Sequence, residues 1–343
     1  MIIGVDTHKR SHTFVTVDDN GKRLKVHTGA TTTEANLTAL QWAETQSDDR
    51  LWALEDNRSM SRRLERDLLL AGERVVRVPT KLMTGCRDSA RTYGKSDPID
   101  ALAVARAALR EPDLPAAVLD GPERDLRVLF DYRQTLVTQR TATVSRLRWD
   151  LHALDPSIDP KPRSLSRSAP LKALLPIIDR FDGVDARLAA RRVATCIELT
   201  AEINDLEREI TTRVQQIAPA LMALVGFGAL NAAKVVAHTA AATRFRSSAA
   251  FARYNGTAPL PVWSSNHQRH RLSRAGNRQL NSAIHIAAIV QIRLHPGARA
   301  LYQRRISQGD GTMEALRIVK RRISDAVFQA LTTPQTTSVR AAA

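Results

Sequence analysis

The 343-residue sequence predicts an α/β domain at the N-terminus, then a long helical connector, then a mainly α-helical C-terminal part. Three observations predict this order. Short apolar runs alternate with helical segments over the first hundred residues, and two long later segments carry apolar residues at spacings of three and four. Basic residues also accumulate toward the C-terminus, with 12 Lys and Arg against 3 Asp and Glu over residues 261–330, compared with 18 against 15 over residues 1–110.

Composition narrows the class of protein. The formal net charge of +16 predicts a polyanionic partner, and nucleic acid fits better than a membrane because no basic amphipathic anchor stands out. Aromatic residues make up only 4%, which argues against base stacking as the main binding mode. No apolar run could span a membrane, MIIGVDTHK lacks signal-peptide features, and the two scattered cysteines, Cys86 and Cys196, fit a reducing compartment. We therefore expect a cytoplasmic protein that binds nucleic acid.

The first strands follow from apolar alternation. Met1–Val5 is a short apolar run that ends at Asp6, and His12–Val17 alternates as a strand does. Asn20-Gly21 predicts a two-residue hairpin turn into a return strand over Arg23–His27.

Helices and strands then alternate. We expect, in order, a helix over Thr33–Thr45, a strand over Leu51–Leu54 that ends at Glu55, a helix over Ser59–Ala71, a strand over Val75–Val78 and a helix that begins near Pro98. An antiparallel meander followed by helices that cross back to parallel strands is typical of the ribonuclease-H-like α/β fold. We place this domain at residues 1–115.

Residues 116–218 form the predicted connector. Pro122–Leu154 fits one long helix rich in arginine, and a Pro/Ser-rich stretch near 155–170 breaks it as a loop or small irregular insert. The next helix, Ala186–Ile217, carries an apolar stripe of Cys196, Leu199, Ile203, Leu206, Ile210, Val214 and Ile217. The stripe fits a coiled coil or helical pair, and equally a core-facing helix within one subunit.

Residues 219–332 are predicted to be mainly helical, and residues 333–343 a disordered tail. Gly226-Phe227-Gly228 resembles the turn of a helix-hairpin-helix, whose amides can meet a phosphate, or an ordinary helix turn. We expect Ser273 to cap a helix of about twenty residues. A further helix over Thr312–Leu331 carries Arg317, Lys320, Arg321 and Arg322, which fit either a solvated face or a nucleic-acid contact.

Asp97 and Asp100 have two interpretations. Asp97 suits an N-cap, with Pro98 at the first helical position and Asp100 in the first turn, where the helix dipole favours negative charge. Residues three apart also share a helix face, so both carboxylates can reach one cation. Asp6 and Glu55 each follow an apolar strand, at the kind of place where functional residues gather. Four acids from three elements fit two Mg²⁺ ions about 4 Å apart.

Four sequence blocks resemble the DEDD transposases of the "one-ten" insertion-sequence family, which are related to the Piv-type DNA invertases. The first three are GVDTHK (residues 4–9), ALEDN (53–57) and GKSDPIDA (94–101). The fourth is FARYNGTAPLPVWSSNHQRHRLSRAGNRQLNSAI, where a Y/F-x-G-x-x-P segment leads to a serine and then to a basic R-x-S-[KR]-x-G helix start. The resemblance covers nearly the whole chain, apart from the Pro/Ser-rich insert and the last dozen residues.

The resemblance implies a RuvC-like N-terminal domain in which Asp6, Glu55, Asp97 and Asp100 bind Mg²⁺. A coiled-coil linker would follow, and the C-terminal domain would carry a nucleophilic serine, which falls on Ser264. By the family pattern this serine attacks a DNA phosphate and forms a covalent protein–DNA intermediate. The pattern also implies a structured guide (bridge) RNA from the element itself, which pairs with donor and target double-stranded DNA, and a tetramer of two dimers with shared active sites.

Some residue assignments stay open. Ser265 stands where the family often has glycine, so Ser264 and Ser265 are alternative nucleophiles, and His267 and His270 are candidate general bases. The candidates for nucleic-acid binding are Arg269, Arg271, Arg274, Arg278, Arg317, Lys320 and Arg321.

Three functions fit these features. We favour an RNA-guided DNA recombinase, which requires both Ser264 and the acids. The second is a RuvC-like Mg²⁺-dependent nuclease or junction resolvase that acts by hydrolysis and requires only the acids. The third is a non-catalytic nucleic-acid-binding protein in which the acids merely cap helices.

Overall fold

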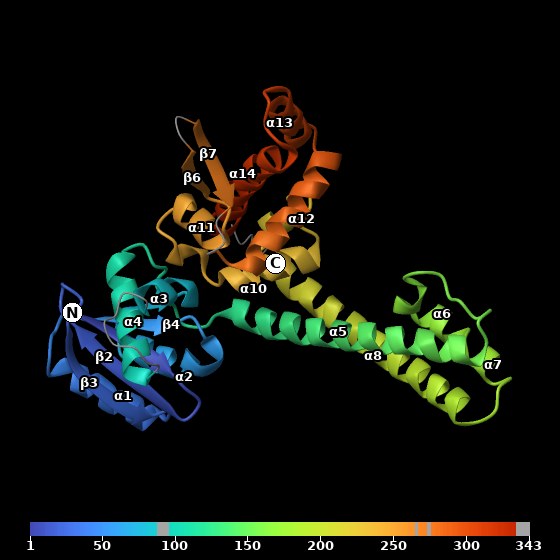
Figure 1. The fold of residues 1–343 in the computed structure, drawn as a ribbon, viewed down its shortest axis with the longest axis horizontal. Helices are drawn as coiled ribbons and strands as arrows, with labels where there is room; N and C mark the ends of the chain where they lie inside the picture. The colour runs from blue at the N-terminus through green and yellow to red at the C-terminus, as the bar shows by residue number, and fades with distance from the viewer. Residues whose placement is uncertain (88–95, 265–266, 273–275, 334–343) are drawn as a thin grey trace, which may run out of the picture. The chain divides into compact units, whose positions relative to one another are not determined.

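A computed structural model describes residues 1–87, 96–264, 267–272 and 276–333, with the backbone alone over 261–264 and 267–272 (Figure 1). The chain forms two compact units. The first comprises Met1–Gly121 together with Ala241–Ala343, and the second comprises Pro122–Ala240. None of the described helices combines the length and apolarity needed to cross a membrane.

The N-terminal part of the first unit contains a five-stranded mixed sheet with the order β3-β2-β1-β4-β5. Its strands are β1 (Ile2–Thr7), β2 (Ser11–Val17), β3 (Arg23–Ala30), β4 (Leu51–Glu55) and β5 (Val75–Val78). β1 pairs antiparallel with β2 and parallel with β4, and β4 pairs parallel with β5. The predicted meander followed by parallel crossover strands is therefore confirmed.

Two boundaries differ from the prediction. Asp6 lies inside β1 rather than after it, because the pairing with β2 continues through Thr7. The turn between β2 and β3 is also longer than two residues. The Asp18 amide donates to the Lys22 carbonyl at 3.1 Å, and Gly21 takes a φ of +75°, a left-handed conformation that glycine adopts without steric cost.

α1 (Thr33–Glu44) and α2 (Arg58–Leu70) cover one face of the sheet. Alternate strand residues point to this face, as the pleat of a β-strand requires. Together with the helices they form a core of Ile3, Val5, Phe14, Ala39, Leu40, Ala43, Trp52, Leu54, Leu64, Leu68, Val75 and Ala117.

The other face is covered by α3 (Thr80–Arg87), a helix that the sequence pattern did not predict, and by α4 (Asp97–Arg110). α4 packs directly on β1 at Gly4. A Cβ atom added there would lie 2.1 Å from the Ala101 carbonyl oxygen and 2.5 Å from the Ala105 amide nitrogen. Only glycine allows the helix backbone to approach the strand this closely.

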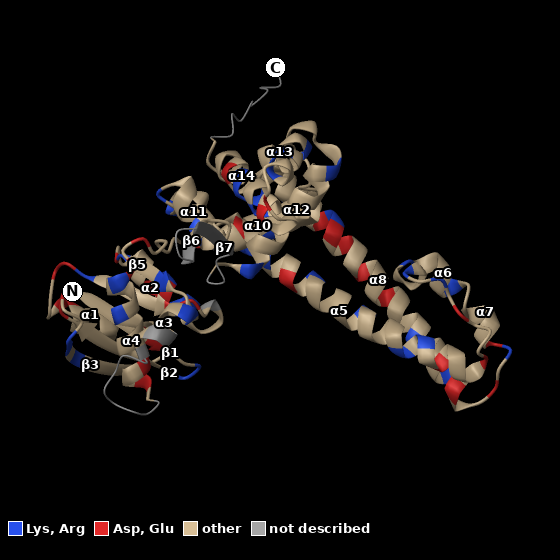
Figure 2. Ribbon diagram, turned by 45° about the horizontal axis from the view of Figure 1, so that its top comes forward, with Lys and Arg blue, Asp and Glu red and all other residues tan. Residues whose placement is uncertain are grey.

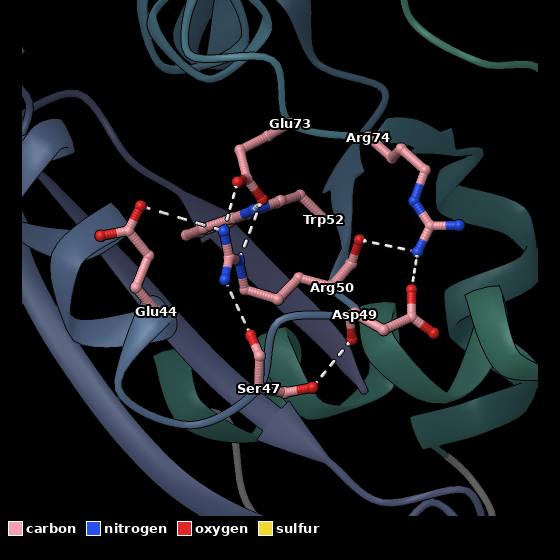
Figure 3. Close-up of polar contacts among 7 residues, drawn as sticks. All are labelled: Glu44, Ser47, Asp49, Arg50, Trp52, Glu73 and Arg74. Carbon is pink, nitrogen blue, oxygen red and sulfur yellow. Dashed lines mark hydrogen bonds and ion pairs between the residues drawn. The ribbon is translucent and has the colours of Figure 1, made fainter.

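An ion-pair network joins the loops that lead into β4 and β5, at the edge of the sheet where the parallel strands begin (Figure 3). Two nitrogens of Arg50 donate to the two carboxylate oxygens of Glu73, at 2.6 and 3.2 Å. The Trp52 indole donates to the same carboxylate at 2.7 Å, and Arg74 pairs with Asp49. Acidic groups at this edge are thus neutralised by arginine.

The second unit is built on two long helices, α5 (Pro122–Leu154) and α8 (Val184–Ile217), which lie side by side (Figure 1). They run antiparallel. Arg133, early in α5, donates to Glu207, late in α8, at 2.9 Å, whereas Asp150 pairs with Arg192. The predicted apolar stripe therefore serves a helical pair within one chain.

Residues between these helices form more structure than a loop. They contain η1 (Ser164–Ser166), α6 (Ser168–Lys172) and α7 (Leu175–Ile178). Their apolar side chains close the end of the helical pair in a core that includes Leu147, Leu151, Leu165, Leu171, Leu174, Ile178, Val193 and Cys196. The unit ends with α9 (Pro219–Met222), a turn in which Gly226 has a φ of +89°, and α10 (Ala229–Thr239).

The C-terminal part of the first unit comprises η2 (Ala242–Arg244), α11 (Ser248–Asn255), the hairpin strands β6 (Pro259–Ser264) and β7 (His267–Leu272), α12 (Arg278–Leu294), α13 (Pro296–Ser307) and α14 (Thr312–Thr332). The hairpin was not predicted. The expected N-cap Ser273 lies outside the described residues, and α12 is instead capped by Asn277, whose side chain accepts from the Gln279 and Leu280 amides. The expected tail likewise lies outside them, from residue 334 onward.

The two ends of the hairpin meet in a backbone contact. A Cβ atom on Gly276 would lie 2.3 Å from the amide nitrogen of Gly256, so the two glycines pack without side chains between them. The Asn277 amide also donates to the Tyr254 carbonyl at 2.7 Å. The start of β6 and the end of β7 are therefore fixed to the same point.

A Gly4→Ala substitution tests the α4 contact. The added methyl group overlaps helix backbone, which cannot rotate away, so we expect a loss of about 1–3 kcal/mol or more in the free energy of unfolding. Urea denaturation followed by tryptophan fluorescence measures it. Gly29→Ala in β3 is the matched control, because its Cβ would meet atoms no closer than 3.5 Å and should cost under about 1 kcal/mol. Equal losses in both variants would contradict the contact.

Candidate functional site

Gly4, Asp6 and His8 define one face at the end of β1. Side chains two residues apart on a strand point to the same side of the sheet, and Gly4 faces α4. Asp6 therefore points toward the N-terminal end of α4, and His8 contacts Asp97 there. His8 lies just beyond the strand, where its amide donates to the Ser11 carbonyl at 3.0 Å and holds the turn into β2.

Glu55 reaches the same edge from the neighbouring strand. β1 and β4 pair in register with Val5 beside Leu54, so Asp6 and Glu55 are the next residues along the two parallel strands. Adjacent strands lie about 4.8 Å apart and in-register side chains share a face. The Glu55 carboxylate accepts a hydrogen bond from the Thr80 hydroxyl at 3.0 Å.

α4 brings the two remaining acids. Its N-cap is Ser96 and its first residue is Asp97, so the predicted capping role of Asp97 is wrong. Pro98 stands second in the helix, where its missing amide hydrogen is equally harmless. The Asp97 side chain instead contacts His8, with 3.3 Å between Asp97 Oδ1 and His8 Nε2. Asp100, one turn on, is buried.

The environment of Asp6 disfavours its charged form. Asp6 is 4% exposed, and burial raises the pKa of its carboxyl group, with further upward contributions from the charges of Asp100 and Asp97. The His8 imidazole acts in the opposite direction, since its Nε2 lies 3.0 Å from Asp6 Oδ2. A divalent cation placed here would remove the same repulsion.

The donor set fits a divalent metal ion. Ligand atoms of Asp6, His8 and Asp97 all lie within 4.8 Å of one another, and carboxylate oxygens are the ligands that hard divalent cations prefer. Asp100 and Glu55 are not part of this 4.8 Å set: Asp100 acts on Asp6 through its charge, and Glu55 follows Leu54 on the strand paired with β1. Sequence reasoning missed His8, although the alternation of Gly4, Asp6 and His8 on one strand face was a visible signal.

The hairpin carries the predicted nucleophile. Ser264 is the last residue of β6. Ser265 and Arg274 lie outside the described residues. For His267, Arg269, His270 and Arg271 the structure describes only the backbone of β7.

The other basic candidates differ in exposure. Arg278 is exposed at the start of α12, and Arg317 and Arg321 are partly exposed on α14, paired with Glu314 and Asp325. Figure 2 shows basic residues on α13 and α14. Lys320 is different, because it is buried and its ammonium group donates to Asn281 Oδ1 at 2.6 Å. Burial lowers the pKa of Lys320.

Lys320 belongs to a buried polar network beneath the hairpin. The Asn281 amide donates to the Asn255 carbonyl at 3.0 Å, and the Asn255 side chain donates to the Ser324 hydroxyl at 2.8 Å. Asn255 also accepts from the amide and hydroxyl groups of Thr257, two residues before β6. The network therefore ties α11, α12 and α14 to the chain that leads into the hairpin.

Two family profiles match the chain, and together they cover well over half of it. A DEDD transposase profile of the IS110 type, described as "Transposase", matches residues 3–156, which contain the four acids. A second profile, described as "Transposase IS116/IS110/IS902 family", matches residues 218–303, which contain the hairpin and α12.

Similar proteins belong to insertion elements of Mycobacterium and Streptomyces species. The chain is 25% identical to the uncharacterized 42 kDa protein of insertion element IS900 from Mycobacterium paratuberculosis, over 94% of this chain and 93% of the relative. It is 25% identical to the uncharacterized 44.8 kDa protein of IS116 from Streptomyces clavuligerus, over 96% and 94%. A third relative is the uncharacterized 43.6 kDa protein of IS110 from Streptomyces coelicolor, also 25% identical, over 74% and 75%.

Asp6→Asn is expected to stabilise the metal-free protein. Because the folded-state pKa of Asp6 is raised, the wild type loses stability as pH rises above the ordinary aspartate value of 3.8, and asparagine removes that loss. We expect the melting temperature at pH 7.5 to rise by about 2–4 °C in scanning calorimetry with chelator, with the difference vanishing near pH 3.5.

Asp67→Asn provides a control of opposite sign. Asp67 is buried on the other face of the sheet, and hydrogen bonds from Asn36 and Arg66 outweigh burial and lower the pKa of its carboxyl group. Its charge stabilises the fold above the ordinary pKa, so the variant should melt lower. A lower melting temperature for both variants would contradict the raised pKa of Asp6.

Proposed function

The chain belongs to the IS110 family of insertion-sequence transposases, and we propose that it cuts and rejoins DNA through a covalent phosphoserine intermediate on Ser264. The observation that carries the proposal is the convergence of Asp6 and Asp97 at one edge of the sheet, within a chain whose second matched block contains Ser264. Membership of the family implies an enzyme that cleaves and transfers DNA strands.

We assign the N-terminal sheet to the ribonuclease-H-like (RuvC-like) type. Its strand order, β3-β2-β1-β4-β5, supports the assignment, as do the parallel pairing of β1 with β4 and the position of the acids where β1 and β4 end. Asp6, Glu55, Asp97 and Asp100 then hold Mg²⁺. When bound, the metal would polarise the scissile phosphate and ease loss of the proton from the attacking oxygen.

The proposed reaction has two transfers. Ser264 Oγ attacks the phosphorus, an Oγ–P bond forms, and the bond from phosphorus to one flanking deoxyribose oxygen breaks. That oxygen leaves as a free hydroxyl after it accepts a proton. A hydroxyl of the second DNA partner then attacks the phosphoserine, forms the new phosphodiester and returns the proton to Ser264. Phosphodiester bonds are conserved, so no high-energy cofactor is consumed.

The proposed partners follow from charge and family. The net charge of +16 and the basic C-terminal stretch support binding to donor and target DNA through phosphate contacts. A structured guide RNA and assembly from dimer to tetramer are carried over from the family resemblance. Arg269, Arg271, Arg274, Arg278, Arg317 and Arg321 remain the proposed nucleic-acid contacts, and the burial of Lys320 favours a supporting role for it.

A search for a covalent protein–DNA adduct tests the central step. Full-length protein would be incubated with Mg²⁺, labelled element-end DNA and RNA transcribed from the element's non-coding end, then denatured and separated on a gel. We expect the wild type and Ser265→Ala to retain label, and Ser264→Ala and Asp6→Asn to fall about 10³-fold or more, because nucleophile and metal act in one step.

The hydrolytic alternative predicts a different pattern. DNA cleavage that persists in Ser264→Ala, with no adduct in any sample, would exclude the serine mechanism and favour a RuvC-like nuclease. An adduct lost in Ser265→Ala but kept in Ser264→Ala would move the nucleophile by one residue. Cleavage that is unaffected by Asp6→Asn would remove the metal site from the reaction.

The basic residues can be separated by salt dependence. Each lost phosphate contact reduces the slope of log K against log salt by about 1. We expect this reduction for Arg278→Gln, measured on duplex DNA by fluorescence anisotropy between 50 and 200 mM salt. Lys320→Gln should leave the slope unchanged and lower the melting temperature, since Lys320 is buried against Asn281. Equal slope changes in both variants would contradict this division.

A further inference from the structure

His8 is the one basic side chain among the described residues whose ion pairs are with Asp6 and Asp97. A single atom makes both contacts, since Nε2 lies 3.0 Å from Asp6 Oδ2 and 3.3 Å from Asp97 Oδ1. In the neutral tautomer with the proton on Nδ1, Nε2 is available as a metal ligand, and it lies within 4.8 Å of ligand oxygens of both carboxylates.

We propose that His8 ligates a divalent cation together with Asp6 and Asp97, and that this nitrogen ligand makes the site prefer Mn²⁺ to Mg²⁺. The proposal rests on the metal-dependent function proposed above and adds a ligand that the four acids do not include. Imidazole binds first-row transition metals readily, whereas Mg²⁺ favours oxygen ligands and retains its waters.

The local fold suits a ligand role. His8 is the first residue after β1, and its Nε2 lies 3.0 Å from the carboxylate of Asp6 on that strand. The His8 amide is fixed by the Ser11 carbonyl, which limits movement of the imidazole. Asp97 is the first residue of α4, and α4 is held against β1 at Gly4. All three ligands therefore come from fixed backbone.

The exposure of the ligands also fits a metal that exchanges. The side chains of His8 and Asp97 are 47% and 51% exposed, whereas that of Asp6 is 6% exposed. A cation bound here would have one buried carboxylate behind it and an open side toward solvent. Substrate oxygens or water could fill that open side, as a catalytic rather than a structural site requires.

Nitrogen coordination can be detected directly on full-length protein loaded with Mn²⁺. Electron spin echo envelope modulation records the ¹⁴N nucleus of an imidazole bound to the metal. We expect this modulation in the wild type, its replacement by a ¹⁵N pattern in protein labelled with ¹⁵N-histidine, and its loss in His8→Ala. His152→Ala, which changes an exposed residue of α5 in the second unit, is the matched control and should keep it.

Affinity gives a second readout that does not depend on activity. The affinity for Mn²⁺, measured from the electron paramagnetic resonance signal of the free ion, should fall about 10-fold or more in His8→Ala. Mg²⁺ binding, measured by competition, should change less than about 3-fold, because the carboxylates remain. His8→Gln keeps a polar side chain but removes the imidazole, so it should show the same loss of affinity as His8→Ala. Agreement between the two variants would show that the loss does not come from misfolding of one of them.

The outcomes separate this proposal from the function on which it rests. Mn²⁺ that binds to the wild type without nitrogen modulation, and is lost in Asp6→Asn, overturns the His8 ligand and leaves the acidic metal site intact. Equal weakening of Mn²⁺ and Mg²⁺ in His8→Ala also overturns the preference. Failure of the wild type to bind either cation overturns both the ligand and the metal-dependent function.

Discussion

The contact between α4 and β1 at Gly4 is the constraint on which the candidate site depends. Because no side chain separates the helix from the strand, the first turn of α4 is brought down to the end of β1. Asp6 and Asp97, which are 91 positions apart in the sequence, then meet through His8. Helix and strand are each rigid, so their packing distance sets the spacing of the ligands more firmly than any loop could.

Acidic residues have different partners at the two ends of the parallel strands. At the edge where β4 and β5 begin, Glu73 and Asp49 are paired with arginines and the indole of Trp52 completes the network. At the edge where β1 and β4 end, the described partners of Asp6 and Glu55 are an imidazole and a hydroxyl. Burial and the neighbouring acids raise the pKa of Asp6 at this edge, and perturbed pKa values cluster at functional sites.

Strand and helix periodicity predicted most of the α/β domain and placed Asp6, Glu55, Asp97 and Asp100 near the ends of three elements, because the alternation of buried residues is visible in the sequence. The features that were not predicted have weaker sequence patterns. α3 has only eight residues. β6 contains two prolines, and β7 consists mainly of basic and polar residues. Ser96 and Asp97 suit an N-cap equally, so only the structure could separate them. His8 required knowledge of which face of β1 meets α4, and that depends on residues distant in sequence.

The antiparallel pairing of α5 and α8 restricts how the length of this protein can change. Each added residue turns a helix by about 100° and lengthens it by about 1.5 Å, so one or two extra residues in α5 would rotate its buried side chains away from α8. About seven residues restore the original face after two turns, but only when α8 gains the same number. The α5–α8 pair is therefore expected to change in length by matched steps of about 10 Å in both helices. The small helices of residues 164–178, at the end of the pair, would keep their packing.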